Sequence, residues 1–384
     1  MHSSLHIACD IDYARPSIKI CLYFAVYSFF FRTACGNSAD YKRAESHDDR
    51  GVSHVTAKKR DGDDVLVGDI GGEFALIKRL TESQQITDPD VIIGVGDDCA
   101  VIRKDDDTYL LVTADMMVED DHFSHKWYTP EQIGGKLVES NVSDIVSMGG
   151  APRHGIISMS LPAQTTLSFV DRLYEGIYAS ARRHGLSIIG GDTTRGDRLV
   201  LNLTLIGEVK CAFLRTRAMA QEGDLICVTG ALGKSMGGLR MLMSGIEGDR
   251  SGHLEPRART RAEAHAIAAH AHAMIDVSDG LASEVAHICE QSNTGAVICR
   301  DRIPLAPAAV TAAEALHESA YDYALYGGED FELAFTMPER EIDALRAVFG
   351  DFSIVGRVTA RSGGTTLDID GKREPLRGGF DHFM

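Results

Sequence analysis

The stretch IGVGDDCAVI, residues 93–102, places two adjacent carboxylates, Asp97 and Asp98, between two apolar segments. The apolar residues on either side predict two short strands joined by a glycine turn. A carboxylate beside buried apolar residues is costly unless it is paired or binds a cation. The stretch therefore predicts either a cation site or an ordinary polar turn in which Asp97 serves only the local backbone.

Acidic residues recur at the ends of other predicted strands, at glycine turns and on one helix face. They are Asp115 in VTADMMV, Asp144 in NVSDIVSMGG, Asp192 in IIGGDTT, Asp276 and Asp279 in IDVSDGL, and Glu329 and Asp330 in YGGEDFEL. Ligands bind at strand ends in open α/β sheets, and Mg²⁺ takes one or two carboxylates per ion together with phosphate oxygens and water. This set could hold several ions and a nucleoside triphosphate.

Each of these acids, taken singly, is equally well explained by a turn or a helix cap. Asp279, for example, is expected to cap a helix that begins at Leu281. The recurrence of the pattern, rather than any one residue, favours a cation site.

The composition excludes some classes of partner. Among 384 residues, 56 acidic and 39 basic side chains give a formal net charge of −17. Nucleic-acid binding relies on Lys and Arg to neutralise phosphates, so we expect no nucleic-acid partner. A phosphorylated small molecule remains compatible if metal ions carry the positive charge. The eight cysteines form no CxxC pair, which favours neither zinc nor a disulfide framework and fits a reducing cytoplasm.

Differences in composition and periodicity divide the chain into three parts. Residues 1–67 contain a 14-residue apolar run, 18–31, and then a charged stretch without periodicity, so we expect a poorly ordered extension. The run is shorter than the about 20 residues of a membrane span, and a signal-peptide core is the alternative. Regular α/β patterning follows, and an irregular basic segment near 210–221 predicts a boundary between domains 68–210 and 211–384.

One apparent phosphate-binding loop has the wrong spacing. In VTGALGKSMGG the glycine that a P-loop requires five residues before Gly233 is replaced by Val228, so we expect a simple strand-to-helix turn. The HExxH motif is absent from the sequence. We also expect no Ser-His pair and no activated cysteine in the site.

Nine motifs in order, covering about residues 71–383, resemble the thiamine-monophosphate kinase family of the aminoimidazole-ribonucleotide-synthetase-like superfamily. They are GEFALI, GVGDDCAVI, TADMMVEDDHF, NVSDIVSMGGAP, IIGGDTTRG, GDLICVTGALGKSMGGL, IDVSDGL, YGGEDFEL and GGFDHF. The resemblance implies an α/β (α+β) fold of two-domain, PurM-like architecture. Its N-terminal domain would bind ATP and Mg²⁺ and contribute strands to a β-barrel at a dimer interface, and its C-terminal domain would be a second α/β unit.

The resemblance implies ATP-dependent phosphorylation of thiamine monophosphate to thiamine diphosphate, assisted by Mg²⁺, in a cytoplasmic homodimer with no membrane partner. A sister enzyme making a purine precursor or selenophosphate is an alternative, as are a non-catalytic nucleotide-binding protein and a metal phosphatase. The selenophosphate type carries a reactive cysteine near the start of the folded domain, and the hydrogenase-maturation type ends in cysteine. This chain has no cysteine near Gly72 and ends in DHFM.

The motif matches also imply roles for individual residues. The Mg²⁺ ligands would be Asp98, Thr113, Asp115, Asp144, Asp192, Asp276 and Asp279. ATP would be contacted by Gly191, Asp192, Arg217, Ser278 and Tyr174, and the thiamine part by His122, Glu329 and Phe380. Catalysis would depend on Asp144, Asp276 and Arg217.

Two positions leave this assignment open. Ala114 stands where the family often has a threonine, and Arg215 is an alternative to Arg217. The acceptor in such a reaction is a phosphate with a second pKa of about 6, so it is already an anionic nucleophile and needs no general base. The expected task of the site is to bring two anions into line.

Overall fold

The computed structural model describes residues 69–70, 72–376 and 378 of the chain. All of them belong to one unit, Asp63–Met384. The predicted extension 1–67 and the predicted substrate residue Phe380 lie outside the described residues.

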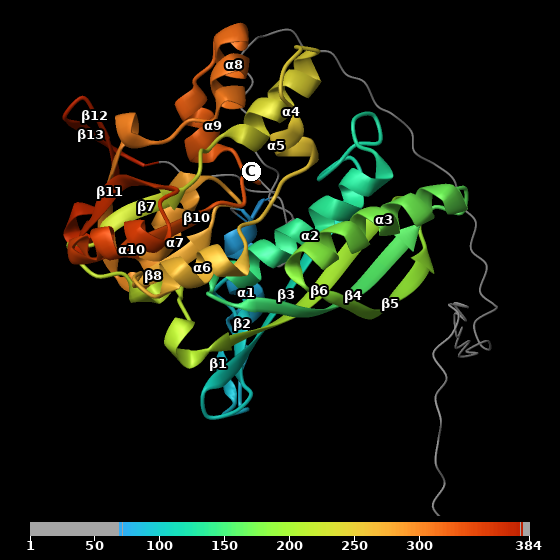
Figure 1. Cartoon of the computed structure of the whole chain (residues 1–384), viewed down its shortest axis with the longest axis horizontal. Helices are drawn as coiled ribbons and strands as arrows, with labels where there is room; N and C mark the ends of the chain where they lie inside the picture. Colours follow the sequence, from blue (N-terminus) through green and yellow to red (C-terminus); the bar gives the residue numbers. More distant parts are fainter. Residues whose placement is uncertain (1–68, 71, 377, 379–384) are drawn as a thin grey trace, which may run out of the picture. The chain divides into compact units, whose positions relative to one another are not determined.

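A six-stranded sheet forms the first half, with the strand order β1-β2-β3-β6-β4-β5 (Figure 1). Its strands are β1 (Val91–Ile93), β2 (Ala100–Arg103), β3 (Thr108–Val118), β4 (Ala151–Leu161), β5 (Ser187–Arg195) and β6 (Val200–Lys210). Among them only β4 and β5 pair in parallel. The long β3 and β6 pair along their whole lengths and form the middle of the sheet.

Two long helices, α2 (Pro130–Ser147) and α3 (Leu167–His184), lie over one face of this sheet (Figure 1). A capping box between Thr129 and Gln132 begins α2. The two helices can approach closely because Gly134 has no side chain. A Cβ at this position would lie only 2.1 Å from the Leu173 carbonyl oxygen. The short α1 (Glu73–Thr81) precedes the sheet.

A seven-stranded sheet forms the second half, in the order β13-β12-β9-β11-β7-β10-β8. Its strands are β7 (Leu225–Thr229), β8 (Ala273–Asp276), β9 (Thr294–Cys299), β10 (Leu333–Met337), β11 (Phe352–Ala360), β12 (Thr365–Ile369) and β13 (Lys372–Pro375). Every residue of β7 is buried. Leu225 and Cys227 join the core that includes α2 and the first sheet, whereas Ile226 and Val228 join the core that includes α7.

The helices of the second half are α4 (Lys234–Ser244), α5 (Ser251–Leu254), α6 (Arg261–Ala268), α7 (Leu281–Ser292), α8 (Pro307–Leu316), α9 (Ala320–Tyr326) and α10 (Ile342–Val348). No helix among the described residues is both long and apolar enough to cross a membrane. The predicted α/β fold with two sheet-based halves is confirmed, and the β-barrel between two copies stays a prediction.

Candidate active site

Four buried carboxylates from four separate segments come together between the halves. We call Asp98, Asp115, Asp144 and Asp276 the acid cluster; they lie after β1, on β3, on α2 and at the end of β8. Burial, followed by the charges of the other three acids, raises the pKa of Asp144 well above its usual value. Burial and the charge of Asp98 likewise raise the pKa of Asp276. The cluster therefore favours a bound cation or proton.

Hydroxyl groups hold three of these carboxylates in place. The hydrogen bonds run from Thr113 Oγ1 to Asp144 Oδ2 at 2.5 Å, from Ser143 Oγ to Asp276 Oδ2 at 2.7 Å, and from Ser147 Oγ to Asp98 Oδ2. Both serines belong to α2, which also supplies Asp144 itself. This one helix therefore orients carboxylates from both halves of the chain.

Arg217 is the basic residue that pairs with the acid cluster. Its Nε lies 3.2 Å from Asp98 Oδ1, its Nη2 bonds the same oxygen, and the Asp98 side chain is only 1% exposed. Arg215 instead donates to the backbone carbonyls of Ala271, Ala212 and Leu214. Of the two arginines that the sequence leaves open, only Arg217 lies at the cluster.

Asp97 binds the backbone of its own turn, as the sequence alternative proposed, but also the backbone of the distant Arg217. Its carboxylate accepts hydrogen bonds from the backbone N–H groups of Asp98 and Arg217, at 3.1 and 3.2 Å. Burial, and then the charge of Asp98, raises its pKa to about 7.

The donor set of the acid cluster suits a hard cation. Carboxylate and hydroxyl oxygens are the ligands that Mg²⁺ prefers, and charges buried without compensation are costly. Within the part of the chain that the structure describes, no three His, Cys, Asp or Glu side chains form a group that could hold a metal ion by itself. The residues therefore fit ions that take one or two protein carboxylates each and complete their coordination with phosphate oxygens and water.

The predicted helix cap at Asp279 is wrong. The N-cap of α7 is Gly280, with φ 101° and no side-chain capping bond. The backbone N–H of Asp279 donates to Glu284 Oε1 at 2.8 Å, because Glu284 reaches back from the first turn of the helix. The turn thereby presents Ser278 and Asp279 to the neighbouring pocket.

Asp192 does not join the acid cluster within one chain. It lies on the exposed edge strand β5, in register through Ser158 and Asn202 with Met116. Since successive residues of a strand face opposite sides, Met116 and Asp192 share one side of the sheet and Asp115 faces the other. Asp192 is also three strands away from β3, about 14 Å at the usual spacing. Its assignment as a metal ligand stays a prediction.

Gly191 and Tyr174 were also expected to contact ATP. Gly191 precedes Asp192 on β5. Tyr174 lies half-buried on α3, with its ring centroid 5.6 Å from that of Tyr178. Their assigned contacts stay predictions.

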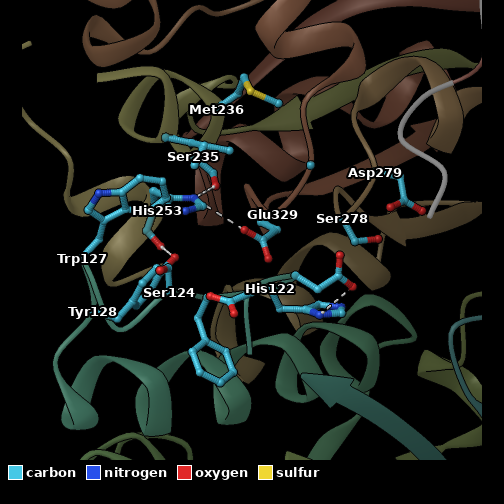
Figure 2. Close-up of a pocket in the computed structure, with 15 residues that line it drawn as sticks. His122, Ser124, Trp127, Tyr128, Ser235, Met236, His253, Ser278, Asp279 and Glu329 are labelled. Atoms are coloured by element: carbon cyan, nitrogen blue, oxygen red, sulfur yellow. Dashed lines mark hydrogen bonds and ion pairs between the residues drawn. The ribbon is translucent and has the colours of Figure 1, made fainter. Parts of the chain in front are cut away.

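A cavity of about 220 Å³ contains both described residues that were expected to bind thiamine, His122 and Glu329 (Figure 2). Figure 2 shows Glu329 between His253 and His122. The lining residues include three aromatic side chains, an apolar side chain of α4 and the turn that follows β8: Phe123, Trp127, Tyr128, Met236, Ser278 and Asp279. The cavity therefore reaches the turn that directly follows Asp276 of the acid cluster. We call it the acceptor pocket.

The acceptor pocket contains a Ser-His pair, which the sequence had led us not to expect. Ser235 Oγ lies 3.0 Å from His253 Nδ1, and Glu329 Oε2 lies 3.6 Å from the same nitrogen (Figure 2). In a Ser-His-acid triad the serine and the acid contact different ring nitrogens. Burial, followed by the charge of Lys136, also lowers the pKa of His253 to about 4. The arrangement does not fit hydrolytic catalysis.

In the loop whose sequence looks like a P-loop, a carboxylate of the protein occupies the backbone N–H groups. The backbone N–H groups of Gly233 and Ser235, at the start of α4, donate to the Asp330 carboxylate at 2.5 and 3.0 Å. A P-loop would offer such groups to a phosphate. The predicted strand-to-helix turn is confirmed.

A second cavity, of about 450 Å³, opens on another side of the acid cluster. It is lined by the glycine turn 94–96 and by Asp97, Asp98, Thr113 and Ala114. Asp98 of the cluster thus lines this second cavity, whereas the acceptor pocket reaches Ser278 and Asp279, directly after Asp276 in the chain.

Sequence reasoning missed most of the supporting residues. Lys136, Ser140, Asp144 and Ser147 follow helical spacing on α2, and the flanking apolar positions are buried. A polar stripe on an otherwise apolar helix was the available signal. The long-range partners of this stripe, such as Glu329, leave no pattern in the sequence.

Comparison with known proteins agrees with this geometry. Residues 96–209 match the AIR synthase related protein, N-terminal domain, and residues 221–368 match the corresponding C-terminal domain. A thiamine-monophosphate kinase of Escherichia coli (strain K12) is 33% identical over 325 residues, which cover 81% of this chain and 98% of that protein. A relative of the same name from Bacillus subtilis (strain 168) is 35% identical over 284 residues, 71% of this chain and 86% of that one.

A solved structure of AaThiL complexed with AMPPCP and TMP superimposes with a TM-score of 0.71 at 30% sequence identity. The match covers 81% of this chain and 97% of that chain.

Proposed function

Since this chain belongs to the thiamine-monophosphate kinase family, we propose that it transfers the terminal phosphoryl group of ATP to thiamine monophosphate, giving thiamine diphosphate and ADP. The observation that carries the proposal is the convergence of the acid cluster beside the acceptor pocket. Asp98, Asp144 and Asp276 come from segments that are far apart in the sequence, and the acceptor pocket ends at the turn that follows Asp276. A phosphate bound at this turn would contact the cations that the acid cluster holds.

The acceptor pocket suits the organic part of thiamine monophosphate. Trp127 and Tyr128 provide aromatic surface, and Glu329, which is partly buried, provides a negative charge for a cationic ring. Ser278 and Asp279 stand at the end where the phosphate of the acceptor would lie.

Asp98, Asp115, Asp144, Asp276 and Asp279 would hold Mg²⁺, and the hydroxyl group of Thr113 would support them. Bound Mg²⁺ would neutralise and align the phosphates of donor and acceptor. Arg217 would add a positive charge next to Asp98 for the nucleotide. The acceptor phosphate is the nucleophile, so the proposed in-line transfer needs no general base from the protein.

We propose that the functional unit is a homodimer in the cytoplasm. The uncovered side of the first sheet carries exposed apolar side chains, of which Met116 is 55% and Ile156 38% exposed. Packing this side against a second copy would form the expected barrel. The five cysteines that the structure describes are all free, as in a reducing compartment.

The test is to incubate the full chain with Mg²⁺, ATP and thiamine monophosphate and to follow the products by phosphorus NMR. The proposal predicts one equivalent of ADP for each thiamine diphosphate formed. ADP without thiamine diphosphate would move the acceptor to that of a sister enzyme. Free phosphate released from thiamine monophosphate without ATP would indicate a phosphatase. No turnover would favour a nucleotide-binding protein.

A further inference from the structure

A buried lysine supports the acceptor pocket from behind. Lys136 lies on α2, two turns before Asp144, and its side chain is only 2% exposed. It is not among the residues that line the cavity. Burying an ammonium group is costly unless it is paired and hydrogen-bonded. The groups around Lys136 therefore show which part of the site its charge stabilises.

The Lys136 ammonium group has three oxygen partners. Its Nζ lies 2.6 Å from Glu329 Oε1, 2.8 Å from the backbone oxygen of His122 and 3.4 Å from Tyr128 Oη. A lysine has three N–H donors, so these contacts account for all of them. All three partners belong to residues that line the acceptor pocket, and Glu329 belongs to the second half of the chain.

Glu329 is held from its backbone as well. It adopts φ 66°, a conformation that non-glycine residues rarely occupy, and its N–H donates to the Ser278 carbonyl oxygen at 2.7 Å. Burial acts to raise the pKa of Glu329, but Lys136, followed by His253, holds it below its usual value. The result is a carboxylate of fixed position inside an apolar and aromatic pocket.

We propose that Lys136 is a positioning residue of the acceptor pocket: it holds Glu329 and the His122 loop in the geometry that binds the thiamine part of the acceptor. The inference rests on the proposed function. Lys136 acts through Glu329 and not on the phosphates, because its donors are already used and it lies outside the cavity. Loss of its charge should therefore affect binding of the acceptor and leave binding of ATP nearly unchanged.

The experiment is a double-mutant cycle with Lys136→Met and Glu329→Gln, measuring kcat and the KM values for both substrates. We expect Lys136→Met to raise the KM for thiamine monophosphate roughly 10- to 100-fold, as for loss of one partner of a buried charge pair, with the KM for ATP changed less than about twofold. In the Glu329→Gln background the same change should cost less than about threefold, because the two residues act as one unit. Lys136→Arg should recover part of the loss.

Lys210→Met is the matched control, since Lys210 pairs with Asp107 at the surface. Additive effects in the cycle would overturn the inference, as would a fall in kcat with an unchanged KM for the acceptor. If Lys136→Met fails to fold, the comparison of Glu329→Gln with the double variant, which buries no unpaired charge, still decides: a further large loss refutes the inference. An active wild type with an unaffected Lys136→Met refutes this inference alone, whereas an inactive wild type refutes the proposed function and this inference with it.

Discussion

Asp144 occupies the most crowded electrostatic position of the site. Three other carboxylates raise its pKa, and Thr113 is the hydroxyl donor that opposes them. A structural role alone would not need such repulsion, because an amide of the same shape would be less costly. The position is explained if the charge is used to hold cations.

We predict that Asp144→Asn lowers kcat by at least about 100-fold, the order lost when a key electrostatic group is removed from an active site. In metal-free buffer the same variant should be more stable than the wild type, by roughly 1 kcal/mol, because one repelling charge is gone. Added Mg²⁺ should raise its melting temperature less than that of the wild type. Turnover assays and thermal unfolding with and without Mg²⁺ check these expectations.

The control is Asp107→Asn, which changes an exposed aspartate paired with Lys210. It should alter neither turnover nor the response to Mg²⁺. A folded Asp144→Asn enzyme with a near-normal rate would rule out a catalytic role for this carboxylate.

At the level of elements, α4 shows that a residue far along the chain can determine what a local motif binds. Its first turn offers backbone N–H groups as a phosphate loop does, yet Asp330, almost a hundred residues later, occupies them. Burial raises the pKa of Asp330 to about 7, although the two backbone hydrogen bonds act to lower it. The helix start is thus satisfied inside the protein.

This geometry predicts a specific pH dependence of stability. Asp330 has a usual pKa of 3.8 and a value of about 7 in the fold, so between these pH values the folded state binds a proton that the unfolded state lacks. Stability should therefore fall as pH rises from about 4 to 7, by up to about 1.4 kcal/mol per pH unit for this group, and level off above 7. The difference in unfolding free energy between the wild type and Asp330→Asn isolates this contribution. A difference that is flat across this range would contradict the raised pKa.

The sequence predicted elements whose pattern is local and missed contacts that join distant segments. The long strands β3 and β6 were predictable because they are mostly apolar runs, and the helix α2 was predictable because its apolar residues follow helical spacing. The four-residue helix α5 is too brief to show a helical period in the sequence. The cap assigned to Asp279 failed because Gly280 occupies the N-cap position, one residue later, and Glu284 of the first turn binds the Asp279 N–H.

The residues of the site also fall into those that the sequence revealed and those that it did not. Asp98, Asp115, Asp144 and Asp276 were recognisable from motifs, and the structure brings them together. Lys136 was not recognisable, because its partner Glu329 is nearly two hundred residues away and a single lysine in a helix usually indicates a surface position.

At the scale of the whole molecule, one side of the first sheet lacks a covering layer in the described chain. Helices α2 and α3 cover one side (Figure 1), whereas on the other side Met116 and Ile156 are exposed. Exposed apolar patches of this kind are typical of protein interfaces. The proposed homodimer would bury them, and with them the side of the sheet that carries Asp192.

We predict that Ile156→Asp converts the dimer to a monomer, because the interface would have to bury an unpaired charge. Sedimentation velocity on the full chain measures the change. Leu167→Asp places the same charge at the start of α3, where the side chain is 83% exposed, and should leave the oligomeric state unchanged. A wild type that sediments as a monomer at micromolar concentration would refute the proposed dimer.

The only tryptophan of the entire 384-residue chain lies in the wall of the acceptor pocket. The Lys126 Nζ lies 5.4 Å from the centroid of the Trp127 ring, and the rest of the lining comes from loop residues, from α4 and from His253 of α5. The indole emission of the protein therefore originates from a single point, beside the place where the acceptor would bind. Filling of the pocket can be read optically from the native protein, without a label and separately from nucleotide turnover.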